Sequence, residues 1–257
     1  MDTDLTGRVA MVTGGSRNIG RAIAETLADA GARVAVVWQS DEGGAKETVD
    51  AISAAGHTAQ SFHLNLLDLA SIASCVAEIE AALGPVDILV NNAAIRPERE
   101  LADVTPELWD EIFGINVKGP FFLSQAVIPG MVERRWGRLI SLGGLHGYVG
   151  SRHRTQVHAS KVALIGMTRG LAYETAPYGV TANIVVPGRI ATTRGAAELY
   201  GAQMDTTEAA RKVLMQRMGK PQEIASMVLF LASDQAAYIS GQEMFVTGGV
   251  FPLVPGL

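Results

Sequence analysis

The chain has 257 residues, a length that fits either one large domain or two small ones. Apolar residues make up 48% of it and charged residues 18%, a composition that excludes a disordered chain and allows a sizeable core. The single cysteine excludes an intramolecular disulfide framework. With 21 basic and 26 acidic residues the formal charge is −5, which excludes bulk attraction to nucleic acid or to an anionic membrane. No segment reads as a signal peptide or a membrane span, so we expect a cytoplasmic protein.

Short β-branched runs alternate with longer amphipathic stretches along the chain. We expect strands at residues 8–13, 33–38, 58–63, 86–90, 138–142, 181–186 and 243–246. Helical spacing lies between them, as in Ile19, Ile23 and Leu27. Near-continuous apolar strands separated by helices indicate a parallel sheet covered on both faces, either an eight-fold α/β barrel or an open doubly wound sheet.

The first strand-to-helix turn distinguishes these two architectures. Residues 13–20 (TGGSRNIG) lead from the first predicted strand directly into an amphipathic helix. Glycines there let the backbone approach a pyrophosphate, which meets the free N–H groups and the positive end of the helix dipole. A tight turn without a ligand is the alternative for such a turn taken alone. The pattern favours a doubly wound, Rossmann-type α/β fold, and because no linker is visible we expect one dinucleotide-binding domain over residues 1–257.

From this turn onward the chain resembles the short-chain dehydrogenase/reductase family, whose first fingerprint is T-G-x-x-x-G-x-G. Further family motifs follow in the expected order: Asn91-Asn92-Ala93-Ala94, Asn116, Lys161, Pro187-Gly188 and Ile239-Ser240-Gly241-Gln242. The resemblance therefore covers almost the whole chain. It implies an oxidoreductase that binds a nicotinamide cofactor and a small-molecule substrate, with no metal site.

The resemblance also assigns cofactor contacts to residues in several segments. They are Gly14, Ser16, Arg17, Ile19 and Gly20 for the phosphates, Asn65 for adenine, Asn92 and Ala93 for the adenosine ribose, Lys161 for the nicotinamide ribose, and Ile190 and Thr192, beside Pro187 and Gly188, for the carboxamide. Asn65 stands where the family has an aspartate. It keeps the hydrogen-bonding reach of that side chain but not its charge.

The choice of nicotinamide cofactor depends on the end of the second predicted strand. A carboxylate there accepts the ribose 2′-hydroxyl and repels a 2′-phosphate, but no acidic residue precedes Asp41. Arg17 matches the basic residue often seen in NADP-dependent members, and an arginine–phosphate hydrogen bond contributes about 1.5–3 kcal/mol. The sequence therefore favours NADP over NAD, although Gln39 replaces the usual second basic residue.

The catalytic motif is where the chain departs from the family. Ketone-reducing members use a Ser, a Tyr and a Lys, with the last two spaced Y-x-x-x-K on one helix face. Lys161 fits, but Val157 occupies the tyrosine position and Gly144 the serine position. Tyr148 and Tyr173 do not have the required spacing. Because a positioned acid is worth about 10²–10⁴ in rate, we expect carbonyl reduction to be severely impaired unless another group donates the proton.

Histidine and arginine residues are the candidates for the missing groups. His146, His153 and His158 lie in one segment, and any of them can titrate near neutrality. The run around His146 resembles 3-hydroxybutyrate dehydrogenases, in which a His and a later Lys hold the substrate carboxylate. Arg154 takes the later position and Arg96 a third, so the resemblance implies an anionic substrate bound by Arg96, His146 and Arg154. Solvated loop arginines and packing histidines are the alternative.

Three functions are compatible with these residues. Hydride transfer to an imine, or to a carbonyl protonated by His146 or water, is favoured by the glycine loop and by Asn116 and Lys161. A lyase or C–C hydrolase would use the His and Arg residues, with Gly143 and Gly144 enlarging the pocket. A catalytically silent or nucleotide-sensing subunit is the third, because function depends on the site and not on the fold. We expect the first, with Asn116, Lys161 and His146 as catalytic residues.

The assembly and the substrate loop are also implied by the resemblance. The family usually forms homotetramers or dimers through long helices, here near residues 121–131 and 161–173. The apolar segment 250–257 fits a subunit contact. Residues 193–215, rich in Gly, Ala and Met, are expected to form an insertion that sets substrate specificity.

Overall fold

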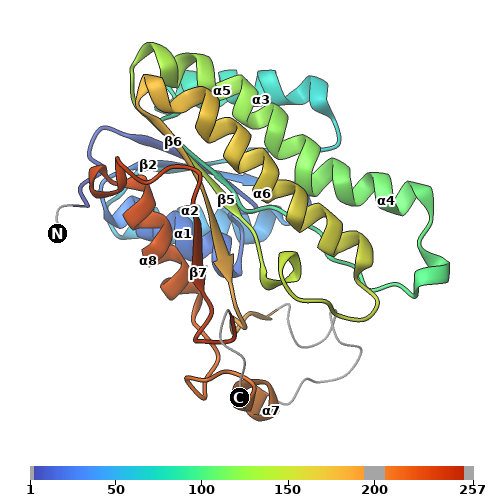
Figure 1. Cartoon of the computed structure of the whole chain (residues 1–257). Coiled ribbons are helices and arrows are strands. Elements are labelled where there is room, and N and C mark those ends of the chain that lie inside the picture. The colour runs from blue at the N-terminus through green and yellow to red at the C-terminus, as the bar shows by residue number, and fades with distance from the viewer. Residues whose placement is uncertain (1–2, 194–205, 252–257) are drawn as a thin grey trace.

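The computed structural model describes residues 3–193 and 206–251. Seven parallel strands form one sheet in the order β3-β2-β1-β4-β5-β6-β7 (Figure 1). The strands are β1 (Val9–Thr13), β2 (Arg33–Trp38), β3 (Ala59–His63), β4 (Ile88–Asn91), β5 (Gly137–Leu142), β6 (Val180–Pro187) and β7 (Glu243–Val246). Their ends lie within two residues of the sequence prediction. The open order confirms the doubly wound fold and excludes the closed barrel.

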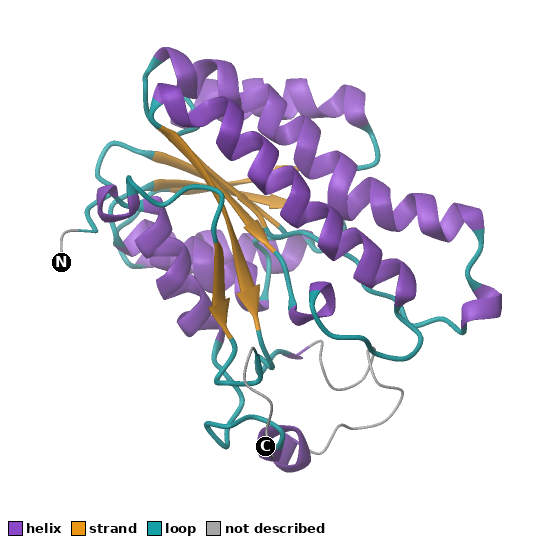
Figure 2. Cartoon of the chain, in the orientation of Figure 1, coloured by secondary structure: helices purple, strands orange, loops and turns teal. Residues whose placement is uncertain are grey.

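Helices cover both faces of this sheet (Figure 2). One layer consists of α1 (Asn18–Asp29), α2 (Glu42–Ala54) and α8 (Pro221–Ala232), and the other of α3 (Leu69–Leu83), α5 (Gly119–Glu133) and α6 (Thr155–Thr175). The first layer buries Ile23 and Leu27, which confirms the helical spacing read from the sequence. The second buries Leu123 and Val127 against the opposite face. Because both faces are covered, ligands can reach only the edges of the sheet.

In the second layer, two consecutive helices are joined by a π-helical turn. Helix α4 (Pro106–Phe113) begins at Thr105, whose hydroxyl accepts from Leu108 N. It continues through a π-helical turn at Gly114–Lys118 into α5. Such π turns are uncommon and often mark functional positions. Asn116 lies within it.

The domain prediction falls partly on residues that are not described. Residues 194–205 of the expected insertion, and 252–257 of the apolar C-terminal segment, lie outside the described ranges. The described remainder of the insertion contains the short helix α7 (Thr206–Arg211). Within residues 3–193 and 206–251, no helix has the length and apolar character needed to cross a membrane.

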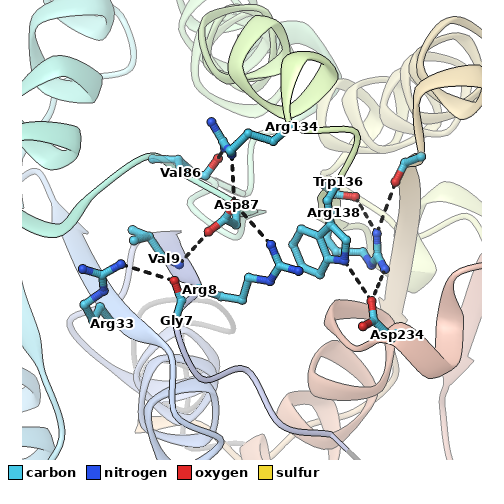
Figure 3. Close-up of polar contacts among 12 residues, drawn as sticks. Gly7, Arg8, Val9, Arg33, Val86, Asp87, Arg134, Trp136, Arg138 and Asp234 are labelled. Atoms are coloured by element: carbon cyan, nitrogen blue, oxygen red, sulfur yellow. Dashed lines mark hydrogen bonds and ion pairs between the residues drawn. The ribbon is translucent and has the colours of Figure 1, made fainter.

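At the amino edge of the sheet, one buried carboxylate holds several elements together (Figure 3). Asp87, 5% exposed, directly precedes β4. Its carboxylate accepts from Val9 N at 3.1 Å and from Arg134 Nε at 3.3 Å, and lies 3.8 Å from Arg8 Nη1. It therefore ties β1 and the end of α5 to β4.

An aromatic ring extends this network toward α8. The guanidinium carbons of Arg8 and Arg138 lie 3.6 and 4.2 Å from the ring centroid of Trp136. Arg138 is 1% exposed, and burial lowers the pKa of its guanidinium, which stays paired with Asp234 at 3.0 Å. Trp136 Nε1 also donates to Asp234 at 2.8 Å. These cation–π and ion-pair contacts fix β5 to the loop after α8.

We expect Asp87→Ala to lower the free energy of unfolding by about 2–3 kcal/mol, because it leaves Val9 N–H and Arg134 without their acceptor. Urea denaturation followed by circular dichroism measures this difference. Asp50→Ala is the matched control, since Asp50 forms an exposed i,i+4 pair with Lys46 and its loss should change stability little. Equal stability of the two variants would contradict the structural role of Asp87.

Candidate active site

The turn between β1 and α1 is closed by direct backbone contact. A Cβ atom at Gly20 would lie 2.0 Å from the carbonyl oxygen of Gly14 and 2.6 Å from Asn92 Nδ2, so only glycine fits at position 20. Thr48 Oγ1 on α2 supports the same turn, because it lies within hydrogen-bond distance of the carbonyl oxygens of Gly15 and Ser16, at 3.2 and 3.3 Å. The turn thus brings the first residues of α1 to the carboxyl end of β1.

Asn92, the residue after β4, forms hydrogen bonds to this turn. Its Nδ2 donates to Thr13 O at 2.8 Å and to Gly14 O at 3.1 Å. The backbone N–H groups of Asn92 and Ala93 donate to Thr13 Oγ1 at 3.0 and 3.1 Å. The sequence analysis expects Asn92 and Ala93 to lie against the adenosine ribose. The structure shows that the Asn92 side-chain amide holds the turn between β1 and α1 in position.

The N-terminus of α1 is open to a ligand. At its N-cap, Arg17, no side chain among the described residues makes a capping hydrogen bond, in contrast to Asp41 at α2 and Asp68 at α3. The first N–H groups of a helix have no partner within the helix. This glycine cradle with an uncapped positive helix end fits the pyrophosphate of a dinucleotide.

Polar side chains gather at the carboxyl ends of β2 and β3, near the turn between β1 and α1. Arg17 Nε lies 3.8 Å from the carboxylate of Asp41, which also accepts from Gly44 N. Gln39 Nε2 donates to Asn65 Oδ1 at 3.2 Å. From the sequence, Asp41 lies too far beyond the second strand to be expected at the cofactor ribose. In the structure, the start of α2 brings Asp41 beside Arg17. Arg17 and Asp41 therefore place a cation and an anion side by side at this end of the sheet.

The segment after β6 lies at the same carboxyl edge of the sheet, on the other side of β4 and β5 from the turn after β1. A Cβ at Gly188 would lie 2.6 Å from Thr247 Cα, so glycine is required where β6 passes the end of β7. Beyond it, Ile190 forms an isolated parallel bridge with Gly219, and Ala191 N donates to Gly219 O at 2.8 Å. Pro187 closes β6, and Thr192 follows this anchored stretch. Ile190 and Thr192 therefore stand at the carboxyl edge of the sheet, as the resemblance implies.

Lys161 and Asn116 meet where α6 crosses this edge. Lys161 is 7% exposed, its Nζ donates to Leu142 O at 2.9 Å, and burial together with Arg96 lowers its pKa to about 8. Asn116 Nδ2 donates to Ile95 O and Ser160 Oγ at 2.9 and 3.0 Å, and its Oδ1 accepts from Ile95 N. The π-helical turn thus connects the loop after β4 to α6.

One turn before Lys161, Val157 is completely buried. Gly144 lies at the end of the loop that follows β5, and a Cβ at this position would meet no atom within 4 Å. A Cβ at the neighbouring Gly143 would lie 2.9 Å from Ile184 Cδ1. The two glycines therefore differ: the space at Gly144 is open, but its φ of +157° strains any other residue, whereas a side chain at Gly143 would overlap Ile184.

His146 lies in the short 3-10 helix Leu145–Gly147, among positive charges. Its Nδ1 is buried and has no hydrogen-bond partner among the described residues. Burial first, and then Arg154, His158, Arg96 and Lys161, lower its pKa to about 4. The expectation that His146 titrates near neutrality is therefore wrong, because desolvation and neighbouring cations disfavour its charged form.

His158 supports this loop from α6. Its Nδ1 contacts the backbone oxygen of His146, and its Nε2 accepts from Ser151 N at 3.1 Å. These partners assign the neutral tautomer with the proton on Nδ1. The two imidazole rings meet edge to face, with centroids 5.0 Å apart. His158 thus holds the loop that carries His146.

The two arginines of the predicted anion site differ in environment. Arg154 is 3% exposed and is paired with Glu98, while its Nη1 donates to Arg96 O at 3.3 Å. Arg96 is exposed. Both act electrostatically on His146, which places them in one neighbourhood. The pairing of Glu98 with Arg154 was not predicted, because no sequence motif surrounds Glu98.

Tyr148 belongs to a different contact. Its hydroxyl donates to Glu243, which also accepts from Arg169 Nη2 at 2.6 Å, and its ring packs against Phe245 and Phe251. Burial and Glu243 raise the pKa of this phenol. Glu243 begins β7 and pairs with Ile184, three residues before the end of β6. Tyr148 is therefore engaged by Glu243 and by the two aromatic rings of Phe245 and Phe251.

The fold and site define a doubly wound enzyme of the dinucleotide-binding class. A family model described as enoyl-(acyl carrier protein) reductase matches residues 14–251. The chain is 42% identical over 247 residues to the 3-oxoacyl-[acyl-carrier-protein] reductase FabG of Escherichia coli K12, covering 95% of this chain and 98% of that protein. It is 36% identical over 251 residues to FabG of Aquifex aeolicus, covering 98% and 100%. The chain belongs to the short-chain dehydrogenase/reductase family of NAD(P)-dependent oxidoreductases.

Solved structures agree with this assignment. A putative short-chain alcohol dehydrogenase from Sinorhizobium meliloti superposes with a TM-score of 0.92 at 37% identity, covering 99% of this chain and 100% of the other. A putative NAD(P)-dependent gluconate 5-dehydrogenase from Beutenbergia cavernae, solved with bound NADP at low occupancy, gives 0.89 at 36% identity, covering 97% and 99%.

Protonation of His146 should make the fold sensitive to acid. Its pKa of about 4 lies below the ordinary value of 6.5, so between these pH values the unfolded chain binds a proton that the folded chain does not. Stability therefore falls as the pH falls through this window. We expect His146→Asn to reduce the loss of unfolding free energy between about pH 7.5 and pH 5, as measured by urea titration.

His153→Asn is the matched control for this measurement. His153 lies in the same segment, has a left-handed backbone with φ +63° that Asn tolerates, and pairs with Glu100 at the surface. This variant should keep the acid sensitivity of the unmodified protein. An unchanged acid sensitivity in His146→Asn would show that His146 is not the group responsible.

Proposed function

We propose that the protein is an NADP(H)-dependent oxidoreductase that acts on a small anionic substrate and works without the phenolic proton donor of its family. Buried Val157, one helical turn before Lys161, is the observation that carries this proposal. A valine side chain cannot donate a proton. Tyr148 and Ser151 are no substitutes, because the first is bonded to Glu243 and the second to His158.

The proposed roles combine the family resemblance with the position of each residue in the fold. NADP(H), when bound, supplies or accepts the hydride. The uncapped N-terminus of α1, with Gly14, Ser16, Ile19 and Gly20, holds the phosphates, and Asn65 and Ala93 line the adenosine. Lys161 binds the nicotinamide ribose, while Pro187, Gly188, Ile190 and Thr192 hold the carboxamide.

The substrate end of the site is proposed to bind an anion. Arg96 is exposed at the site, and Arg154 is held against its backbone carbonyl. Neutral His146 offers the polar Nδ1 atom, which has no partner among the described residues, and not a positive charge. An anionic substrate offsets the surplus of cations that burial leaves around Lys161. Relatives named for acyl-carrier-protein substrates support carbonyl chemistry at the same place in the fold.

A non-redox lyase or C–C hydrolase is the second candidate. Unprotonated His146, with its unpartnered Nδ1, is the observation that favours it, because an unprotonated imidazole nitrogen can accept a proton, although a pKa of about 4 makes it a weak base. The space at Gly144 fits a pocket reshaped for such chemistry. Retention of buried Lys161 favours the redox function, since its remaining role is to bind the cofactor ribose.

The assembly is also a proposal. Helices α5 and α6, the predicted contact helices, expose Phe121, Val162 and Tyr173 at 41%, 51% and 88%. Apolar side chains of this size at the surface mark an interaction site. We propose a homo-oligomer, a tetramer or dimer, that covers them.

Cofactor binding tests the proposed function. We expect NADPH to bind more tightly than NADH, as followed by the fluorescence of Trp38 or of the nicotinamide. Arg17→Ala should weaken NADPH at least about tenfold, through the loss of a charge-assisted bond to the 2′-phosphate, and leave NADH unchanged. The control is Arg21→Ala, one turn further along α1 and paired with Glu25. Failure to bind either cofactor would refute the redox proposal, and equal losses would refute the NADP preference.

Restoring the family's donor groups tests the proposed loss of the phenol. Val157→Tyr with Gly144→Ser should raise the reduction of small keto acids by at least about tenfold, a part of the roughly 10²–10⁴ that a positioned acid contributes. NADPH oxidation at saturating cofactor measures the rate. Val157→Phe with Gly144→Ser is the matched control, because it adds the same ring without the hydroxyl. Equal rates in the two variants would show that the phenol is not what this site lacks.

A further inference from the structure

Asn18 replaces a glycine of the family fingerprint in the turn between β1 and α1, residues 13–20. In the fingerprint T-G-x-x-x-G-x-G it stands where the second glycine is expected, and its backbone keeps the left-handed conformation of a glycine, with φ +52°. Among non-glycine residues, Asn is one of the few that adopt this region readily. The substitution therefore preserves the turn and adds a polar side chain at the first residue of α1.

That side chain reaches the segment after β6. Asn18 Oδ1 accepts from Thr193 N and from Thr193 Oγ1, each at 3.0 Å. Two donors on one atom identify it as the oxygen of the amide. The Nδ2 group is therefore directed away from Thr193, and none of the hydrogen bonds found among the described residues uses it as a donor.

The contact crosses the cleft at the carboxyl edge of the sheet. Asn18 follows β1 and Thr193 follows β6, and in the sheet these strands are separated by β4 and β5. With about 4.8 Å between neighbouring strands, β1 and β6 lie roughly 14 Å apart. Thr193 reaches across because the chain before it is anchored by Ala191 N to Gly219 O. The strand order reverses between β1 and β4, which is where such sheets bind dinucleotides.

We propose that Asn18 and Thr193 form a clasp over the bound dinucleotide, so that Asn18 is a positioning residue that slows cofactor release. The proposal rests on the proposed function, since it places the cofactor between the phosphate loop and the Ile190–Thr192 segment. Asn18 belongs to a stretch assigned to cofactor contacts, and Thr193 directly follows another, the Ile190–Thr192 segment. The Nδ2 group, which donates no hydrogen bond found among the described residues, is a further donor that a glycine at this position lacks.

The test is the rate of NADPH release from the full-length protein, measured by stopped-flow displacement. Asn18→Gly should release NADPH about five- to tenfold faster, and Thr193→Val, which keeps its backbone donor, about two- to threefold faster. The double variant should be no faster than Asn18→Gly alone, because both changes remove the same contact. This non-additivity distinguishes a clasp from two independent structural effects.

Arg135→Gly is the matched control. Arg135 is another non-glycine residue with a left-handed backbone, φ +53°, but it lies at the amino edge of the sheet just before β5. Its replacement should leave the release rate unchanged. Thermal melting of each variant reports folding, and Asn18→Gly should be at least as stable at the turn because glycine adopts a positive φ freely.

Two further outcomes separate this inference from the proposed function. If the unmodified protein binds NADPH and Asn18→Gly releases it at the same rate, or if the two effects are additive, the clasp is refuted and the proposed function stands. If the unmodified protein binds neither NADPH nor NADH, the proposed function fails and the clasp fails with it.

Discussion

The close approach of α1 to the end of β1 is the constraint on which the site depends. Because a Cβ at Gly20 would overlap the carbonyl of Gly14, the helix starts at the strand end only with glycine at this position. The Asn92 amide then fixes the turn from β4, and Thr48 fixes it from α2. Every other part of the cleft is placed relative to this turn, since strands on both sides run parallel and end at the same edge.

The second constraint is the accumulation of positive charge beside α6. Burial disfavours charge on Lys161 and His146, and the surrounding cations reinforce this effect. Glu98 offsets part of the charge by pairing with Arg154. A site with this balance stabilises an anionic ligand more than a neutral one, which supports the proposed class of substrate. The same balance makes His146 a neutral hydrogen-bonding group.

Much of the fold could be predicted because its signals are local. The seven strands follow from short apolar runs, and Gly20 and Gly188 from motifs at fixed spacing. The candidate residues of the cofactor cleft follow from the family resemblance, and their roles stay predictions. Asp41 beside Arg17 was not foreseen, because the start of α2 brings it back toward the phosphate loop. The contact of Asn18 with Thr193 joins residues 175 positions apart, so no local pattern announces it.

The sequence by itself determined the family and the order of the elements, and it predicted that Val157 stands in place of the expected tyrosine, because these depend on residue type and spacing along the chain. Tertiary structure alone decided that the pKa of His146 is lowered, that Arg154 pairs with Glu98 and that the Tyr148 hydroxyl donates to Glu243. Each of these depends on desolvation and on charges brought together from distant segments. Such quantities arise only when the chain is folded, because they fall steeply with distance and with exposure to water.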